Sequence, residues 1–95
     1  MKKAAKIKGF TQIPVGECVI IRTVTHYFTG RVVSESERWI ALDEAAWVAD
    51  TGRFAEALKT GVLAEIEPYP GPCLVAVGAV VDVSPWPHPL PRMVV

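Results

Sequence analysis

This sequence has no long apolar run, only two cysteines and no net charge. No uninterrupted apolar stretch approaches the roughly 20 residues that cross a bilayer, and the first ten residues hold lysines but no apolar signal-peptide core. Ten basic residues balance ten acidic ones, so the formal net charge is zero. We therefore expect a soluble protein of the cytoplasm with no membrane partner.

Motifs for catalysis and for metal binding are also missing. The two cysteines, Cys18 and Cys73, lack metal-ligand spacing; we expect buried thiols, with a disulfide as the alternative. Neither His26 nor His88 has a flanking sequence that suggests a nucleophile, so we expect surface or packing roles. The glycines are dispersed and form no phosphate-binding loop. The sequence predicts no enzymatic activity, no metal site and no cofactor.

Apolar residues, by contrast, are abundant. They make up 51% of the 95 residues against 21% charged, which is rich for one small domain, and part of the surplus is expected in a subunit interface. Charge is unevenly spread, since residues 35–67 carry eight acidic side chains against three basic ones. A basic arm at the start can contact phosphate or an acidic neighbour, and the alternative is a solvated terminus. The arm contains Lys2, Lys3, Lys6 and Lys8.

Three strands are predicted in the first half of the chain. Residues 17–25 are rich in β-branched side chains, and residues 28–34 and 39–45 flank a polar turn at 34–38. Gly30 interrupts the second strand, where a glycine often marks the bend that a small barrel needs. Asp43 and Glu44 are neighbours on the third strand, so we expect them to point to opposite faces and to share no substrate.

The second half is predicted to hold a helix, a connector and two more strands. Residues 53–59 form the helix, since Phe54 and Leu58 lie one turn apart and Gly61 suits a left-handed cap. Residues 62–67 are expected to be extended, and the prolines in residues 68–72 make a stiff connector. Short strands at 74–77 and 80–83 flank Gly78, and the proline-rich residues 85–91 are expected to be polyproline-like.

The order of these segments resembles the Sm, LSm and Hfq family, whose members build a barrel from two motifs joined by a variable segment. Residues 17–45 are similar to the first motif, through Gly30, the polar turn and the apolar residues Ile40, Leu42 and Ala45. Residues 73–84 are similar to the second motif, through two strands about Gly78. The chain thus looks like a divergent bacterial or phage member of the family.

The resemblance implies an all-β fold with a minor α part. The expected architecture is a strongly bent, five-stranded antiparallel Sm-like (SH3-like) barrel, with a short helix inserted between strands 3 and 4. In a single domain spanning residues 1–95, residues 1–16 would be an N-terminal arm and residues 46–72 the helical insertion and proline-rich connector. Residues 85–95 would form a proline-rich tail.

The resemblance also implies a nucleic-acid site, because RNA-binding members hold a base and a phosphate with the first loop and the second turn. The matching loop and turn, with the basic arm, contain Ser36, Arg38, Trp39, Gly78, Lys2, Lys3, Lys6 and Lys8. Arg38 would contact phosphate and Trp39 would stack on a base, although a tryptophan at a strand start also suits a core or an interface. The family's aspartate, asparagine and arginine are absent, and Glu35 and Glu37 would repel a phosphate backbone.

Self-assembly is a further implication of the resemblance. Sm-like subunits form rings by pairing the fourth strand of one copy with the fifth strand of the next. Here those strands carry almost no charge, and bare apolar edges invite aggregation, so paired edges are expected. The implied assembly is a closed homo-oligomeric ring of about five to seven subunits. Its interface would contain Leu74, Val75, Val77, Val80, Val81 and Val83.

Three functions remain open from the sequence. The resemblance implies a ring that binds RNA or other single-stranded nucleic acid. Zero net charge and high apolar content favour the second, a structural or assembly ring, associated with a phage or mobile element, that binds phage or host proteins. The third is a peptide-binding SH3-like barrel whose proline-rich tail docks on an aromatic surface of a neighbouring copy, and it is compatible with either ring.

Overall fold

A curled antiparallel sheet is the main element of the structure. The computed structural model describes residue 13 and residues 15–95. It contains one short helix, α1 (Phe54–Thr60), and one 3₁₀ turn, η1 (Val77–Ala79). The strands are β1 (Cys18–Thr23), β2 (Tyr27–Glu35), β3 (Trp39–Asp50), β4 (Glu65–Pro68), β5 (Cys73–Ala76) and β6 (Val80–Pro85). The fold is therefore mostly β with a minor helical part, as the sequence predicts.

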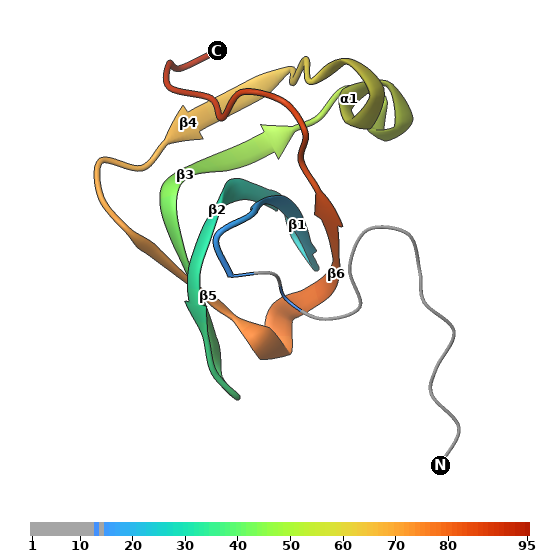
Figure 1. The fold of residues 1–95 in the computed structure, drawn as a ribbon. Coiled ribbons are helices and arrows are strands. Elements are labelled where there is room, and N and C mark those ends of the chain that lie inside the picture. The colour runs from blue at the N-terminus through green and yellow to red at the C-terminus, as the bar shows by residue number, and fades with distance from the viewer. Residues whose placement is uncertain (1–12, 14) are drawn as a thin grey trace.

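The first three strands form a meander that other strands extend on both sides. The hydrogen-bonded order is β4-β3-β2-β1-β6, and β5 pairs with a different part of β3. The sheet curls strongly (Figure 1), but no ladder joins β5 to β6 in the described part of the chain, so it is not closed. Where the sequence predicts five strands the structure has six, because residues 65–68 of the expected insertion pair with β3.

Strand β3 is longer than predicted and serves two partners. The sequence predicts its end at Ala45, whereas the strand continues to Asp50. Its first part, from Trp39 to Leu42, pairs with β5, and its second part pairs with β4. The strand continues because Ala46 and Val48 are fully buried, so the apolar pattern that favours a pleated strand extends past the expected boundary.

Gly30 lies where β2 and β3 bend together. The pairing register shifts between Thr29 and Arg31, so that residues 44 and 45 of β3 lie opposite Gly30 alone. A Cβ atom at Gly30 would lie only 3.1 Å from the Cβ of Leu42 and 3.3 Å from the Cα of Ala45. A side chain at this position would have to push Leu42 or Ala45 away, which favours glycine, and the predicted bend is found here.

Apolar side chains fill two separate cores, one on each face of the sheet. Strand β1 shows the division, because Val19 and Ile21 enter the first core and Ile20 enters the second. The first core, inside the curl, contains Val19, Ile21, Phe28, Val32, Ile40, Leu42, Ala45 and Val75. The second, on the outer face, contains Ile20, Ala46, Val48, Ala57, Leu63, Ile66, Trp86 and Leu90. Both faces of β1 are thus covered, which explains its continuous apolar sequence.

Helix α1 covers part of the second core. Ala57 is fully buried there, and the one-turn neighbours Phe54 and Leu58 pack against the same cluster. Gly61 ends the helix at a φ of 79°, and its N–H donates to the carbonyl oxygen of Ala57 at 2.8 Å. Within residues 13 and 15–95, no helix has the length and apolar character needed to cross a membrane.

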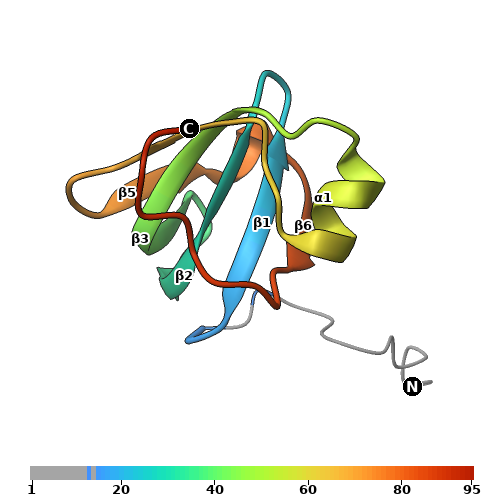
Figure 2. The ribbon, with the colours of Figure 1, turned by 90° about the horizontal axis from the view of Figure 1, so that it is seen from above.

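The proline-rich tail after β6 covers the rest of the second core. Trp86 is only 2% exposed, and Leu90 is also buried. Figure 2 shows the curled sheet from above, with the tail running along its outside. The tail ends beside β4, where the N–H of Val95 donates to the carbonyl oxygen of Ile66 at 3.1 Å and the reverse bond measures 3.2 Å. The tail therefore packs on its own chain.

Candidate functional site

Two strand edges remain without a partner among the residues placed by the structure. Strand β5 pairs only with β3, and strand β6 pairs only with β1. The outer edge of β4 differs, because Val95 forms reciprocal backbone hydrogen bonds with Ile66 there. The tail thus covers one edge, and within residues 13 and 15–95 no strand pairs with the outer edges of β5 and β6.

The residues predicted for an oligomer interface lie on these two strands and, for Val77, in η1 between them, and they separate into two groups. Val75 is buried in the first core, and Val80 and Val83 pack against it. Leu74, Val77 and Val81 stay exposed, at 59%, 37% and 54%. Each edge strand therefore anchors one set of side chains in the core and presents at least one large apolar side chain to the outside.

The residues predicted for nucleic-acid contact lie in two turns that meet. Ser36 orders the β2–β3 turn, since its hydroxyl accepts hydrogen bonds from the N–H groups of Arg38 and Trp39. The N–H of Val77, in η1 beside Gly78, donates to the carbonyl oxygen of Arg38 at 2.8 Å. Arg38 is exposed, and Trp39 is 44% exposed. Lys2, Lys3, Lys6 and Lys8 lie outside the described residues.

The charge of the described region is acidic. Four of the ten basic residues, all lysines, lie outside it, which leaves six basic side chains against all ten acidic ones. Three of those six form ion pairs, Arg22 with Asp82 and both Arg31 and Arg92 with Glu44. Among the described residues this leaves Arg38, Arg53 and Lys59 without an ion pair, and over the whole sequence basic and acidic residues balance.

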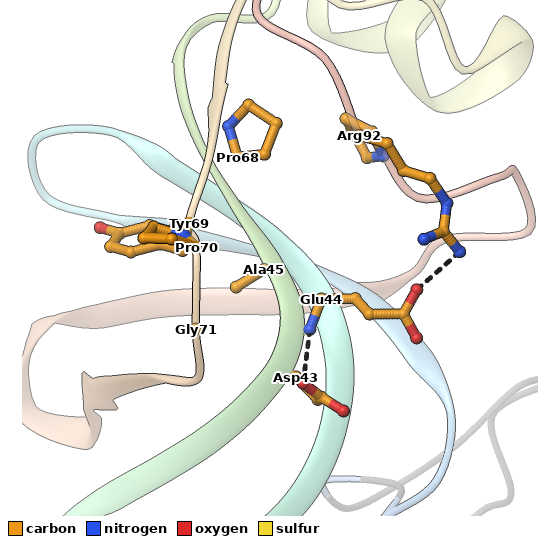
Figure 3. A pocket seen from close by; sticks show the side chains of 9 residues that line it. Asp43, Glu44, Ala45, Pro68, Tyr69, Pro70, Gly71 and Arg92 are labelled. Atoms are coloured by element: carbon orange, nitrogen blue, oxygen red, sulfur yellow. Dashed lines mark hydrogen bonds and ion pairs between the residues drawn. The ribbon is translucent and has the colours of Figure 1, made fainter.

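A pocket that the sequence does not predict lies beside the bend in β3 at residues 43–45. It has a volume of about 260 Å³ and is formed by the β3 bend, the connector after β4 and the tail. Figure 3 shows Tyr69 and Pro70 on one side and Arg92 on the other, with Arg92 reaching to Glu44 at 2.8 Å. The N–H of Tyr69 donates to the carbonyl oxygen of Ala45, which fixes the connector against the bend.

The backbone conformation of Glu44 explains why the sequence does not predict this pocket. Its φ of 49° is left-handed, which is uncommon for a residue with a side chain and breaks the alternation of the strand. Asp43 and Glu44 therefore both line the pocket, whereas the sequence predicts that they point to opposite faces of the strand; that they share no substrate stays a prediction. The paired Arg31 holds the pKa of the Glu44 carboxyl below its ordinary value. The only sequence signal is the glycine opposite, Gly30, which permits the bend.

Aromatic rings gather on the far side of Tyr69. The His26 ring packs against Phe28 at a centroid distance of 4.7 Å and against Trp47 at 5.5 Å, edge to face. Tyr69 stacks on Phe28 at 6.2 Å. A second hollow of about 380 Å³ lies over this cluster, beside Pro68 and Pro70. The predicted packing role of His26 is thus found, within an aromatic surface the sequence does not reveal.

Metal-ligating side chains do not cluster in the described residues. No three side chains of His, Cys, Asp or Glu among residues 13 and 15–95 lie close enough to hold a metal ion. Cys18 and Cys73 are both free and half-buried, so the alternative of a disulfide is not found. Burial raises the pKa of the Cys73 thiol, which makes it a poor nucleophile near neutral pH.

Comparison of the chain with family models, with curated proteins and with solved structures finds no match.

Proposed function

We propose that this protein is a ring-forming, Sm-like β protein with a structural role, in which copies assemble with one another and hold other proteins. The observation that carries the proposal is the pair of unpaired edges, β5 and β6, each with exposed apolar side chains. An exposed apolar strand edge promotes aggregation, because other chains can add to it as extra strands. Native proteins therefore pair or cover such edges. The two edges differ, so the contact is head-to-tail, as in a ring.

The strand order supports the same proposal. Strands β6, β1, β2, β3 and β5 follow one another round the curl, and η1 joins the two ends. The two strands predicted for the second motif, at 74–77 and 80–83, are therefore at the two open ends of the curl, where the proposed contact between copies needs them. The ring of about five to seven copies is carried over from the resemblance.

Exposed apolar side chains support protein partners over nucleic acid. Leu74, Val77 and Val81 are large, apolar and exposed, which suits protein contacts better than phosphate. The chain as a whole carries no net charge, so its charge gives no net attraction to a phosphate backbone. We propose that these partners are phage or host proteins in an assembly associated with a phage or mobile element, as in the second hypothesis from the sequence.

Multi-angle light scattering tests the assembly directly. Wild-type protein at micromolar concentration is expected to show a multiple of the 10.3 kDa chain mass. Leu74→Lys and Val81→Lys place a charge on one edge each and are expected to yield monomers. Val62→Lys is the matched control, because Val62 is as exposed but lies outside every strand. A wild-type monomer would refute the proposal, and so would edge variants that keep the oligomer mass.

Single-stranded nucleic acid is a second candidate, favoured by the meeting of the β2–β3 turn with η1. Arg38 and Trp39 are both exposed beside that junction. Titration of labelled oligo-U and oligo-dT at low salt decides between the two. Saturable binding that is lost in Arg38→Ala and Trp39→Ala, but kept in Arg53→Ala, would establish this candidate. No binding at tens of micromolar would leave the protein-binding role.

A further inference from the structure

The hollow beside Tyr69 has the features of a groove for an extended peptide. It is lined by His26, Trp47, Glu67, Pro68, Tyr69 and Pro70. These residues come from the β1–β2 turn, β3, β4 and the connector that follows β4. We refer to this hollow, with the pocket across Tyr69 and Pro70, as the aromatic groove. Its two halves lie on either side of one proline-flanked tyrosine.

The walls of the groove are rigid and mostly uncharged. Trp47 is half-buried against the first core, and Phe28 lies beneath His26 and Tyr69. Burial lowers the pKa of His26, so its ring is neutral near pH 7 and adds an uncharged face. Tyr69 remains 38% exposed, which is a large aromatic area for a surface that nothing in the described chain covers.

The half of the groove that contains Trp47 is acidic, because Glu67 is its one charged lining residue, whereas the other half is lined by Arg92 as well as by Asp43 and Glu44. Neither Glu67 nor Asp43 forms an ion pair within the described residues, whereas Glu44 is already paired with two arginines. A ligand that carries positive charge beside its apolar part therefore complements this surface.

The chain's own proline-rich tail does not supply the ligand. Trp86 and Leu90 are buried in the second core, and the backbone of Val95 is bonded to Ile66. The tail of a neighbouring copy would have to leave that core before it reached this groove. The hypothesis that the tail docks on a neighbour is therefore replaced by one in which another chain provides the peptide.

We propose that the aromatic groove binds an extended, proline-containing segment of a partner protein with a basic residue at one end. Such a segment is already extended, so binding costs it little conformational entropy, and its rings pack well between aromatic side chains. The basic residue would meet Glu67 or Asp43. This inference names a partner class for the protein-binding part of the proposed function and rests on that part. None of the residues that line the groove belongs to β5 or β6, so the groove is separate from the edges proposed for contact between copies.

Fluorescence anisotropy with a labelled peptide tests the groove. The probe is a peptide of about twelve residues made of Pro-Leu-Pro repeats with arginines at one end. Wild-type protein is expected to bind it with a micromolar Kd, and Tyr69→Ala is expected to weaken binding about fivefold or more. Glu67→Gln should weaken binding of this peptide but not of a version with glutamine for arginine. Glu65→Gln, on the same strand outside the groove, should change neither.

Three outcomes would overturn the inference. They are no binding to the wild type at hundreds of micromolar, equal binding by a folded Tyr69→Ala variant, and displacement of the peptide by a single-stranded oligonucleotide at the same residues. Circular dichroism and the melting temperature show whether each variant is folded. Peptide binding by the Val81→Lys monomer would support the groove independently of the ring, so the two proposals fail separately.

Discussion

His88 and Leu58, thirty residues apart, are joined by a hydrogen bond that connects the tail to the end of the helix. The Nε2–H of His88 donates to the carbonyl oxygen of Leu58 at 2.7 Å. This carbonyl is in the last turn of α1, where the helix itself supplies no donor. The same imidazole lies over Gly61 and packs edge to face on Trp86. One side chain thus completes the helix and positions the tail.

Gly61→Ala is therefore expected to destabilise the protein through two effects. A left-handed φ costs a residue with a side chain about 1 kcal/mol or more. A Cβ at this position would also lie 2.6 Å from the Cγ of His88, which forces the imidazole away from Leu58. The free energy of unfolding, measured by urea denaturation, is expected to fall by more than the backbone cost alone.

Gly52→Ala is the matched control for this prediction. Gly52 also has a left-handed φ, but its nearest neighbour to a new Cβ is 3.9 Å away, so only the backbone cost applies. The difference between the two variants measures the contact with His88. Combining Gly61→Ala with His88→Gly should remove most of that difference, and equal effects of Gly61→Ala and Gly52→Ala would show that the imidazole is not held in place.

Trp86→Ala is expected to be the most damaging single substitution in the tail. Its ring is almost fully buried among Ala57, Leu63 and the other residues of the second core, so its removal leaves a large cavity. Losing a buried tryptophan costs about 3–5 kcal/mol, which exceeds half of the stability of many small domains. Thermal melting measures the loss. Met93→Ala, at a tail residue that is mostly exposed, should leave the melting temperature nearly unchanged, and a mild effect of Trp86→Ala would mean that the tail is not anchored.

The two cores show why composition predicted more interface than the structure requires. The 51% apolar content predicts a subunit interface, and Leu74, Val77 and Val81 are available for one. Much of the surplus is instead used by the second core, under α1 and the tail. The apolar pattern of a strand cannot distinguish an internal core from a subunit interface. An apolar residue on the outer face gives the same sequence pattern whether a helix, a tail or another subunit covers it.

Thr29→Val is expected to stabilise the protein. Thr29 is fully buried in β2, and its hydroxyl oxygen has no hydrogen-bond partner in the described part of the chain. Valine has the same shape without the unsatisfied polar group, so the gain is about 1 kcal/mol. Thr29→Ser, which keeps the hydroxyl and loses the methyl group, should be destabilising. Chemical denaturation distinguishes them, and a Val variant less stable than wild type would mean that the hydroxyl is bonded.

Glu44 is expected to make stability depend on acid pH. The hydrogen bond from Arg31 lowers the pKa of Glu44 in the folded state, so the carboxylate stabilises the fold above the unfolded pKa of about 4.3. That contribution is lost as the pH falls through the lower, folded pKa. The difference in melting temperature between wild type and Glu44→Gln should therefore shrink as the pH falls from 7 toward 3.

Two arginine variants show which partner matters at Glu44. Arg31→Gln should remove more of this pH dependence than Arg92→Gln, because the hydrogen bond from Arg31 has the larger effect and Arg92 is mostly exposed. The hypothesis would be abandoned if the wild type and Glu44→Gln differed by the same amount at every pH.

The candidate sites differ in how far the sequence could predict them. Leu74 and Val81 lie on short strands whose only charged residue is Asp82, which is a local pattern, and the sequence predicts both for an interface. The groove depends on His26, Trp47 and Tyr69, which come together only because the second part of β3 pairs with β4. Residues 46–72 were expected to be an insertion, and no local pattern indicates that Trp47 belongs to a strand facing the connector. Long-range pairing of this kind is set by the whole fold.

The unequal edges of the sheet give the molecule a direction. A head-to-tail contact repeats the same rotation from copy to copy, and it ends in a closed circle only when that rotation divides a full turn. In the proposed ring, the rotation would follow from how tightly β2 and β3 curl, and Gly30 lies where these strands bend together against Leu42 and Ala45. A larger residue at position 30 is then expected to change the angle between successive copies, and a chain of copies that misses closure would continue as a filament.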